Sequence, residues 1–420
     1  MKQQFIGFLT RRKSTRFLLQ RQRRLRDTPR LVINIKKDIA SSHVPPQERK
    51  SVLRILLERI YLNWRYGYLG YIFYFSMKLD RKGERLMDHV TEGEFIPVRD
   101  YVNANYPSQA TAYPGITRDK VLCKHVLSAM GGRVTCCCAH AVIADDSHPG
   151  KIHLVDDFGH SVPWPVLYGK AIFFKPVFSE CGHGVMKFTV VNENKVAYEG
   201  AFISISELER MMGDAVAQYG PAMMEEYIVQ HEAMTRLNPS SVNTIRVMTS
   251  HSADGVKLFG SVCRIGAAGS PNDNYSTGGI IVGVDDSGRL LRHGYRKPEY
   301  GDSELQGHPG TGIVFEGYQI PYYEEAVKLC LDMQKRLTGV YSIGWDIAID
   351  KEGPIIVECN DNWEFELGEI CLGRGFRKEF EETFVRTAKL LKKSSAMYYC
   401  CGMKTFPNPT LFWHSSRSAC

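Results

Sequence analysis

The sequence predicts an α+β fold dominated by antiparallel hairpins. Two observations support this prediction. Short apolar segments end in turns rich in Gly, Asp, Asn and Ser, and amphipathic helical segments alternate with them from about residue 115 onward. The chain contains neither a GxGxxG loop nor a GxxxxGK[ST] loop, so the two commonest nucleotide-binding folds are not indicated.

The composition is that of a globular chain with enough residues for two to three domains. It has 420 residues, of which 44% are hydrophobic and 24% charged. No run approaches the roughly eighteen apolar residues that a membrane-spanning helix needs, and the apolar stretch near the start is too short for a secretory signal. We therefore expect a cytoplasmic protein.

The cysteines do not follow a regular pattern. The chain has twelve, including the adjacent residues Cys136 to Cys138 and the pair Cys400 and Cys401. Neighbouring cysteines of this kind lack the spacing of a disulfide framework or a zinc motif. We expect most of them to be reduced thiols, with a structural metal site as the lesser alternative.

Positive charge is concentrated in a basic N-terminal arm, residues 1–46. Its first thirty residues hold ten lysines and arginines against the single acid Asp27. Basic arms bind anionic lipid, acidic proteins or nucleic acid, although a solvated tail has the same composition. No motif that reads RNA or DNA accompanies the arm, so we do not expect nucleic acid to be a partner.

The region 47–114 is predicted to be helical and rich in aromatic residues. Apolar residues recur at helical spacing from Val52 to Ile60, and the helical prediction extends to about residue 80. The aromatic end of this stretch is too short to span a bilayer. It either lies at an anionic membrane surface on the inner face of the membrane, together with the arm as residues 1–80, or packs against the body of the protein.

From residue 115 onward the expected elements follow one another closely. A helix covers 117–132, with Thr117 as its N-cap and Gly131 and Gly132 as its stop. The tail 395–420 has no clear pattern. The remaining elements are a strand at 171–175, a hairpin of 186–191 and 195–200, a helix at 204–213, strands at 224–229, 241–250, 256–266 and 278–284, a helix at 322–339, a hairpin of 345–350 and 353–360, and a helix at 376–393.

The last of these hairpins carries the sharpest functional signal. A three-residue turn ending at Gly353 uses the positive φ that glycine adopts readily. Asp350 then pairs with Pro354, and counting back along the strands places Asp346 opposite Glu358.

The two faces of this hairpin differ in chemistry. Alternation places Asp346, Ala348, Ile356, Glu358 and Asn360 on one face. Two carboxylates directly opposite each other repel, and a folded protein tolerates them when a cation lies between. Carboxylate and amide oxygens suit a bridged Mg²⁺, although an exposed polar face of an edge hairpin is the alternative. The opposite face is predicted to be core: Ile347, Ile349, Ile355, Val357 and Cys359.

A second signal lies at the end of the strand 171–175. Lys175 is followed by a loop that contains Gly182 and Gly184. A lysine at a strand end is usually solvated, and two glycines usually form a turn. The alternative is a site for an anionic ligand, and the strand by itself does not decide between the two.

Together, the lysine, the glycine loop and the acidic hairpin resemble the ATP-grasp superfamily of carboxylate–amine ligases. Within it, the chain is most similar to the sugar-transfer-associated ATP-grasp proteins, over about residues 115–390. The resemblance implies an ATP-grasp fold, in which two α+β subdomains sandwich ATP, after an N-terminal helical extension. The N-terminal subdomain with its lid loop is expected at 115–230 and the C-terminal subdomain with the metal site at 231–394.

The resemblance also implies roles for residues of the N-terminal subdomain. Lys175 matches the family's second ATP lysine, beside a lid loop at 179–184. Lys120 falls where the family places its first ATP lysine, and Lys124 is the nearby rival. Two ammonium groups converging on a triphosphate would supply charge-assisted hydrogen bonds.

The segment EEYIVQHE resembles the family's adenine hinge. Backbone groups at Glu225, Tyr227 and Ile228 would bind the adenine edge, and Glu232 matches the acid that accepts the ribose hydroxyls. An ordinary strand end with surface acids is the alternative.

Further residues of the resemblance lie after the hinge. Arg246, Arg264 and Asn274 occur in the order in which related ligases place groups around the reacting phosphate. Arg264 is the first choice for stabilising the transferring charge, since its planar fork fits phosphoryl oxygens. Arg246 would serve the same centre or anchor a substrate carboxylate. The matching magnesium ligands are Asp346, Glu358 and Asn360, for one or two Mg²⁺ ions with Mn²⁺ as a substitute.

The activity that the resemblance implies is ATP-dependent ligation of a small-molecule carboxylate to an amine through an acyl phosphate. The family's association with surface polysaccharide suggests amino-acid or sugar-linked substrates. Two alternatives remain: phosphoryl transfer to a hydroxyl on the same fold, and a membrane-peripheral assembly protein with a vestigial ATP site.

Overall fold

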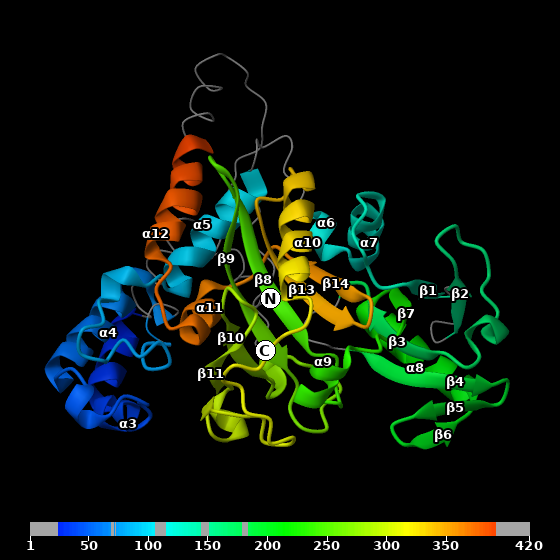
Figure 1. Ribbon diagram of the computed structural model, residues 1–420, viewed down its shortest axis with the longest axis horizontal. Coiled ribbons are helices and arrows are strands. Elements are labelled where there is room, and N and C mark those ends of the chain that lie inside the picture. The colour runs from blue at the N-terminus through cyan, green and yellow to red at the C-terminus, as the bar shows by residue number, and fades with distance from the viewer. Residues whose placement is uncertain are drawn as a thin grey trace, which may run out of the picture. The chain divides into compact units, whose positions relative to one another are not determined.

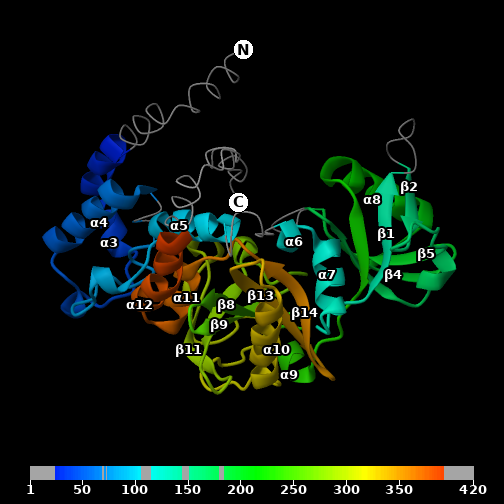
Figure 2. The same cartoon turned by 90° about the horizontal axis from the view of Figure 1, so that it is seen from above.

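The computed structural model describes residues 24–68, 71, 73–105, 115–143, 151–178 and 184–391, and these form two compact units. The first residues of the basic arm, the lid loop at 179–183, and the tail with Cys400 and Cys401 lie outside the described residues. Figures 1 and 2 show the elements of both units.

The first unit combines residues 1–102 with residues 362–390, and its described part is helical. Its centre is an aromatic cluster in which Phe95 stacks on Phe365 with ring centroids 4.0 Å apart and contacts Trp363 and Phe384 edge-on or tilted. Its helices are α3 (Ile35–Ala40), η1 (Pro46–Glu48), α4 (Val52–Tyr66), η3 (Leu86–Asp88), α5 (Glu92–Asn105), α11 (Phe365–Leu372), α12 (Arg377–Phe380) and the π-helical turn η7 (Glu381–Val385).

The helix predicted to reach residue 80 is shorter in the structure. Ser51 caps α4 by accepting a hydrogen bond from the Arg54 amide, and the helix ends at Gly67, whose φ of +82° is not helical. The described residues from 71 to 80 form turns, so this part of the prediction is wrong. One face of α4 carries the exposed side chains Leu53, Leu57, Tyr61 and Trp64, which we call the α4 stripe. None of the helices in the described residues is long and apolar enough to cross a membrane.

The first unit also buries several carboxyl groups. Glu369 Oε1 accepts hydrogen bonds from the amides of Val90 and Phe376, and Glu366 Oε1 accepts one from the Glu92 amide. Burial, reinforced by neighbouring acids, raises the pKa of Glu92 to about 8. Burial also holds the pKa of Glu366 well above its usual range.

The second unit contains two sheets in which every paired strand is antiparallel. The first sheet has the order β2-β1-β7-β3-β4-β5-β6, and α8 packs on it (Figure 2). Because β1, β7 and β3 are neighbours, residues far apart in sequence meet at their ends. The bounds are β1 (Cys137–Ile143), β2 (Ile152–Val155), β3 (Ala171–Pro176), β4 (Met186–Asn192), β5 (Lys195–Tyr198), β6 (Ala201–Ile203), α8 (Ile205–Tyr219) and β7 (Ala222–Glu226).

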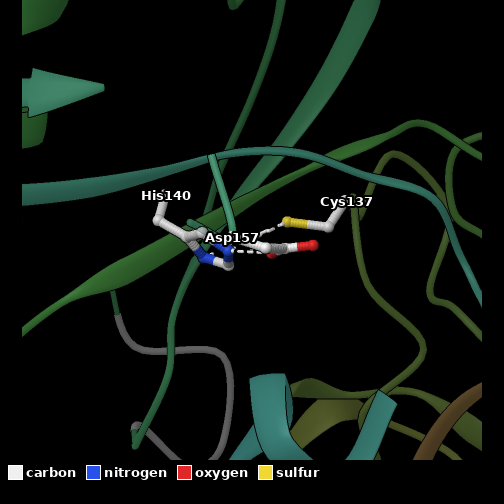
Figure 3. A group of neighbouring side chains, drawn as sticks. All are labelled: Cys137, His140 and Asp157. Carbon is white, nitrogen blue, oxygen red and sulfur yellow. Dashed lines mark hydrogen bonds and ion pairs between the residues drawn. The ribbon is translucent and has the colours of Figure 1, made fainter. Parts of the chain in front are cut away.

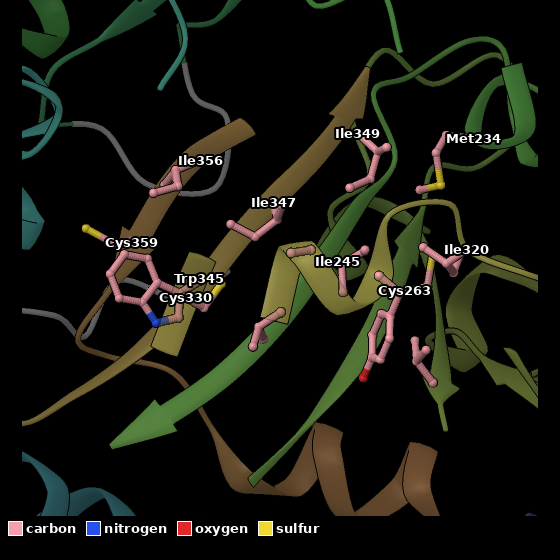
Figure 4. Close-up of a cluster of buried hydrophobic side chains, with 14 of the residues drawn as sticks. Met234, Ile245, Cys263, Ile320, Cys330, Trp345, Ile347, Ile349, Ile356 and Cys359 are labelled. Carbon is pink, nitrogen blue, oxygen red and sulfur yellow. The ribbon is translucent and has the colours of Figure 1, made fainter. Parts of the chain in front are cut away.

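The second sheet has the order β12-β11-β10-β9-β8-β13-β14, and α10 packs against it. Trp345, Ile347 and Ile349 alternate along one strand into the buried cluster of Figure 4. The bounds are α9 (Glu232–Leu237), β8 (Thr244–Ser252), β9 (Gly255–Ile265), η5 (Tyr275–Thr277), β10 (Ile280–Val284), β11 (Leu290–Tyr295), η6 (Pro298–Tyr300), β12 (Glu304–Leu305), α10 (Tyr323–Arg336), β13 (Ser342–Asp350) and β14 (Gly353–Asn360).

The helix predicted at 117–132 is divided in the structure. It forms α6 (Gly115–Arg118) and α7 (Lys120–Ala129). The N-cap is Asp119, whose Oδ1 accepts hydrogen bonds from the amides of Val121 and Leu122 at 3.0 Å each. Thr117 instead donates to Asp361 Oδ1 at 3.0 Å, so its assignment as the cap is wrong. Asp is at least as good an N-cap as Thr.

The acidic hairpin has the predicted cross-strand pair but a different register at its turn. Asp350 pairs with Gly353 rather than with Pro354, so the turn has two central residues. The ladder shifts between Asp346 and Ile347, where a bulge in β14 restores the pairing of Asp346 with Glu358.

The shorter turn also changes which side chains form the core. Ile356 pairs with Ile347 and joins the buried cluster, whereas Ile355 pairs with Ala348 on the face of Asp346. The predicted faces are therefore right for Glu358 and wrong for the two isoleucines of β14, because the extra residue Val357 inverts the alternation between them.

The two sheets lie on either side of the predicted division at residue 230. The structure groups residues 362–390 with the N-terminal residues rather than with the second sheet. The short strands β1, β2, β6, β11 and β12 and the helices α9 and α11 were not among the expected elements. Their few residues give little periodicity from which to recognise them.

Candidate active site

Three neighbouring strands place charged side chains in one row across the second sheet. Asp346 of β13 pairs with Arg246 of β8 on one side and with Glu358 of β14 on the other. Antiparallel partners that lie directly opposite each other point to the same face of a sheet. The row Arg246–Asp346–Glu358 follows from strand register alone.

Arginines hold Asp346 from two strands. Arg246 donates from Nε to Asp346 Oδ1 at 2.5 Å and from Nη2 to Oδ2 at 2.9 Å. Arg264 of β9 donates from Nη1 to Oδ2 at 2.9 Å. Burial by itself would raise the pKa of Asp346, but the two guanidinium groups outweigh it and hold the pKa below its usual range. Asp346 is therefore ionised and neutralised in place.

Arg264 joins this centre to an acid that the sequence reasoning missed. Its Nη2 donates to Asn274 Oδ1 at 2.6 Å and lies 3.2 Å from Asp273 Oδ1. Asp273 Oδ2 accepts from the amide and the hydroxyl of Thr244. Burial raises the pKa of Asp273 despite Arg264. The sequence signal that could have identified Asp273 is its position directly before the predicted Asn274.

Glu358 lies on the opposite side of Asp346 from Arg246 and meets Lys120. Lys120 Nζ, near the start of α7, is 3.4 Å from Glu358 Oε1 and 3.3 Å from the carbonyl oxygen of Val177. Glu358 is partly exposed, with 33% of its side-chain surface accessible. The predicted first lysine thus contacts a predicted metal ligand.

The predicted second lysine has a different neighbour. Lys175 Nζ is 2.6 Å from Glu225 Oε2, and Lys124 Nζ bonds to Glu225 Oε1 and to the Thr135 hydroxyl. Lys175, Lys124 and Glu225 are all buried. The lysine that the structure brings together with Lys175 is therefore Lys124, the rival of Lys120 in the sequence interpretation.

Burial and mutual charge set the ionisation of this group. Burial, with repulsion from Lys175, lowers the pKa of Lys124 to about 8. Burial would raise the pKa of Glu225, but the two ammonium groups lower it to about 2. Despite burial, Glu225 and Glu358 raise the pKa of Lys175. At neutral pH the group carries more positive than negative charge.

The predicted adenine hinge follows β7 directly. The Tyr227 amide donates to the carbonyl of Ala171 at 2.8 Å, and Lys187 Nζ lies 3.6 Å from the centre of the Tyr227 ring. Ile228 is partly buried in the segment after the strand. Glu232 is exposed at the start of α9, and its carboxylate pairs with Arg236 at 2.6 Å. In the part of the chain that the structure describes, this ion pair is separate from the charged clusters around Asp346 and Glu225.

The residues proposed to hold Mg²⁺ fit that ion by their donor chemistry. Asp346, Glu358 and Asn360 offer oxygen atoms from two paired strands. Asn360 Nδ2 is 3.3 Å from Asp346 Oδ2, so its amide lies next to the carboxylate. The repulsion between the opposed acids is offset by Arg246, Arg264 and Lys120. The two opposed acids therefore do not by themselves require a metal, although their oxygen atoms suit one.

The chain belongs to the family of sugar-transfer-associated ATP-grasp proteins, whose pattern matches residues 107–384. The fold is accordingly the ATP-grasp fold. Comparison with curated protein sequences gave no match.

Solved structures give weaker likenesses. A D-alanine–D-alanine ligase from Bacillus anthracis is 14% identical with a TM-score of 0.38, over 67% of this chain and 70% of the other. A biotin carboxylase from Campylobacter jejuni is 13% identical with a TM-score of 0.36, over 66% of this chain and 46% of the other. The family assignment does not depend on these likenesses.

Proposed function

We propose that the protein is an ATP- and Mg²⁺-dependent carboxylate–amine ligase that forms an amide through an acyl phosphate, in the synthesis of a surface polysaccharide or another sugar-linked product. The observation that carries this proposal is the centre at Asp346. Two arginines, an asparagine and a second acid meet there, in the same unit as a buried lysine pair. Such a set can neutralise phosphate oxygens and hold a divalent ion at one place.

In this proposal the lysines bind and orient the phosphates. Lys124 and Lys175 are held by the carboxylate of Glu225, which fixes both ammonium groups before the nucleotide arrives. Preorganised charges of this kind need little rearrangement when a phosphate is bound. The side chain of Glu225 is thus a positioning residue. The backbone groups of Glu225, Tyr227 and Ile228 are the proposed adenine contacts. Glu232 is the proposed acceptor for the ribose hydroxyls.

The arginines act at the reacting centre. A substrate carboxylate oxygen attacks the γ-phosphorus and ADP leaves; the amine then attacks the acyl carbon, phosphate leaves and the amine loses a proton to solvent or a base. Arg264 stabilises the charge on the transferring group, since its guanidinium stays protonated. Arg246 orients Asp346 or a substrate carboxylate, and Asn274 fixes the Arg264 fork at 2.6 Å. Mg²⁺ held by Asp346, Glu358 and Asn360 would supply charge neutralisation on the phosphates.

The test is a screen for ADP release over pairs of small carboxylates and amines, including uronic acids, amino acids and amino sugars, with Mg²⁺ present. We expect ADP to form when both an acid and an amine are supplied. Lys175→Ala should abolish this ADP formation. The matched control is Lys170→Ala, because Lys170 precedes the same strand but pairs with Glu226 near the surface.

The same screen separates the ligase from phosphoryl transfer to a hydroxyl. If ADP release needs an alcohol and proceeds at the same rate without any amine, the ligase proposal is wrong and the protein is a kinase of this fold. The lysines and arginines proposed to bind phosphate would serve either reaction, so the acceptor is the variable that discriminates between the two.

A second candidate concerns location. The α4 stripe presents four exposed apolar side chains beside Arg54 and Arg65, the pattern of a helix that lies in a membrane interface. We propose that it contacts anionic lipid. In a flotation assay with phosphatidylserine vesicles, the Leu57→Glu variant should no longer float with the vesicles. The Val314→Glu variant, changed at an exposed position of the second unit, should still float with them. Equal flotation of both variants would contradict this role.

A further inference from the structure

The first sheet carries a cluster of ligand atoms that the proposed reaction does not use. Cys137 and His140 lie on β1, and Asp157 lies in the turn after β2. One ligand atom from each of the three lies within 4.8 Å of the other two. Figure 3 shows the thiol, the imidazole and the carboxylate converging on one point.

A fourth side chain reaches the same carboxylate from another element. His125 of α7 places Nε2 3.5 Å from Asp157 Oδ1. The cluster thus joins three separate segments of the chain: the helix α7, the strand β1 and the turn after β2. Because His125 does not belong to the group of mutually close ligand atoms, it supports the Asp157 carboxylate from outside that group.

The geometry favours an ion over a proton relay from thiol to carboxylate. In a Cys–His–Asp relay one ring nitrogen faces the thiol and the other faces the carboxylate. Here His140 Nε2 is the nitrogen nearest to both partners, 2.6 Å from Asp157 Oδ1 and 3.8 Å from Cys137 Sγ, while Nδ1 is 4.0 Å from Sγ. A single nitrogen between a sulfur and an oxygen is the arrangement of ligands around a common centre.

The separations are close to those of a tetrahedral zinc site. Zinc bonds of about 2.0–2.3 Å at tetrahedral angles place neighbouring ligand atoms about 3.3–3.6 Å apart. The distance of 3.8 Å from Cys137 Sγ to His140 Nε2 is close to this spacing. The hydrogen bond of 2.6 Å between His140 and Asp157 would open by about 1 Å, which the partly exposed Asp157 turn permits.

We propose that Cys137, His140 and Asp157 bind Zn²⁺, with His125 as a positioning residue that holds the Asp157 carboxylate from outside the metal. A thiolate with imidazole and carboxylate ligands is a soft-to-borderline set that suits Zn²⁺ better than Mg²⁺, which takes oxygen ligands. The site is distinct from the oxygen ligands around Asp346.

Its position in the fold gives the ion a structural consequence. Cys137 pairs with Glu225 across β1 and β7, and Glu225 holds Lys124 and Lys175. His125 immediately follows Lys124 on α7. Zn²⁺ bound here would fix Asp157, which contacts His125, and would so tie α7 to the first sheet next to the lysine pair.

The experiment titrates the metal alone into the chelator-treated full-length chain, without nucleotide. Co²⁺ serves as the spectroscopic probe because a cobalt–thiolate bond gives a charge-transfer absorption in the near ultraviolet. We expect this band to appear, to saturate, and to disappear when Zn²⁺ displaces Co²⁺. The Cys137→Ser variant should lose the band.

Affinity measurements with a chromophoric zinc competitor provide the second readout. His125→Ala and Cys137→Ser should each weaken Zn²⁺ binding by at least about 10- to 100-fold, the loss seen even for outer-shell changes at zinc sites. His125 has half of its side-chain surface exposed, so this variant will fold even if the substitution of the partly buried Cys137 disturbs folding.

The matched control is Cys136→Ser, since Cys136 is the exposed neighbour of Cys137 in the same run of cysteines. It should keep both the cobalt band and the zinc affinity of the unmodified chain. Absence of the band in the unmodified chain, its persistence in Cys137→Ser, or unchanged affinity in His125→Ala would each overturn the proposal.

Discussion

Lys124 and Lys120 lie on the same helix, yet the structure gives them different surroundings. Lys124 is buried and shares Glu225 with Lys175, whereas Lys120 faces Glu358. One turn of helix separates the two residues, so both point broadly toward the sheets. The difference lies in the partner across the site, which the sequence of the helix does not reveal.

We therefore expect Lys124→Gln to weaken nucleotide binding more than Lys120→Gln does. Loss of a charge-assisted hydrogen bond to phosphate costs about 1.5–3 kcal/mol, which corresponds to about 10- to 100-fold in Kd. Titration of each variant with an ATP analogue would measure the difference. Equal weakening by both substitutions would contradict the pairing of Lys124 with Lys175.

Asp346 provides a second prediction at the residue scale. Asp346 is buried, and Asp346→Ala leaves the partly buried Arg246 and Arg264 without their shared carboxylate. Removing one partner of a buried ionic group costs about 3–5 kcal/mol. Denaturant unfolding of Asp346→Ala should show a free energy of unfolding lower by about 3 kcal/mol. Asp254→Ala, in an exposed turn, should leave the free energy of unfolding nearly unchanged. A neutral Asp346→Ala would mean that the arginines re-pair elsewhere.

At the scale of elements, the hairpin of β13 and β14 depends on its turn. Gly353 has φ of +121°, and a Cβ placed there would meet nothing closer than Tyr322 Cδ1 at 3.9 Å. The cost of a side chain at this position is therefore conformational rather than steric. We expect Gly353→Ala to lower the free energy of unfolding by about 1–3 kcal/mol.

Gly115→Ala is the matched control for that measurement. Gly115 has ordinary backbone geometry and nothing within 4 Å of a built Cβ, so the substitution should be close to neutral. Equal effects of the two substitutions would show that the turn tolerates other residues and that register is fixed elsewhere in the sheet.

The pairing of Asp346 with Glu358 was predicted correctly, but from a turn register that differs by one residue from the observed one, and the bulge in β14 compensates for this difference. The bulge that restores this pairing was not predictable, since Val357 resembles any other strand residue. The meeting of Cys137 with Glu225 was also out of reach. It depends on the pairing of β1 with β7, which are far apart in sequence.

The acids of the first unit make its stability depend on pH. Glu92 has a folded-state pKa raised to about 8 from a usual value near 4.5. The folded state therefore keeps a proton that the unfolded state releases, and stability falls as pH rises from about 4.5 through about 8. The slope is at most about 1.4 kcal/mol per pH unit for one proton.

Glu92→Gln should flatten this decline, because the amide keeps the shape of the neutral acid and cannot ionise. Unfolding of the full chain at pH 5, 7 and 8.5 would measure the change, with Glu84→Gln as a control on a more exposed acid. A decline that stays as steep in Glu92→Gln would assign the pH dependence to other groups.

At the scale of the whole molecule, the family pattern covers residues 107–384 and so includes both sheets. The predicted ATP-grasp fold and its α+β class are confirmed. The association of residues 362–390 with the N-terminal residues was not predicted, because the aromatic contacts that join them connect segments more than 250 residues apart and leave no local pattern.

That association also sets an order of events during translation. Phe95 leaves the ribosome early, but Phe365 and Phe384, which cover it, are synthesised only after both sheets. The aromatic side chains of the nascent N-terminal segment therefore remain exposed until the last helices are synthesised. During that time they offer a binding surface to a chaperone.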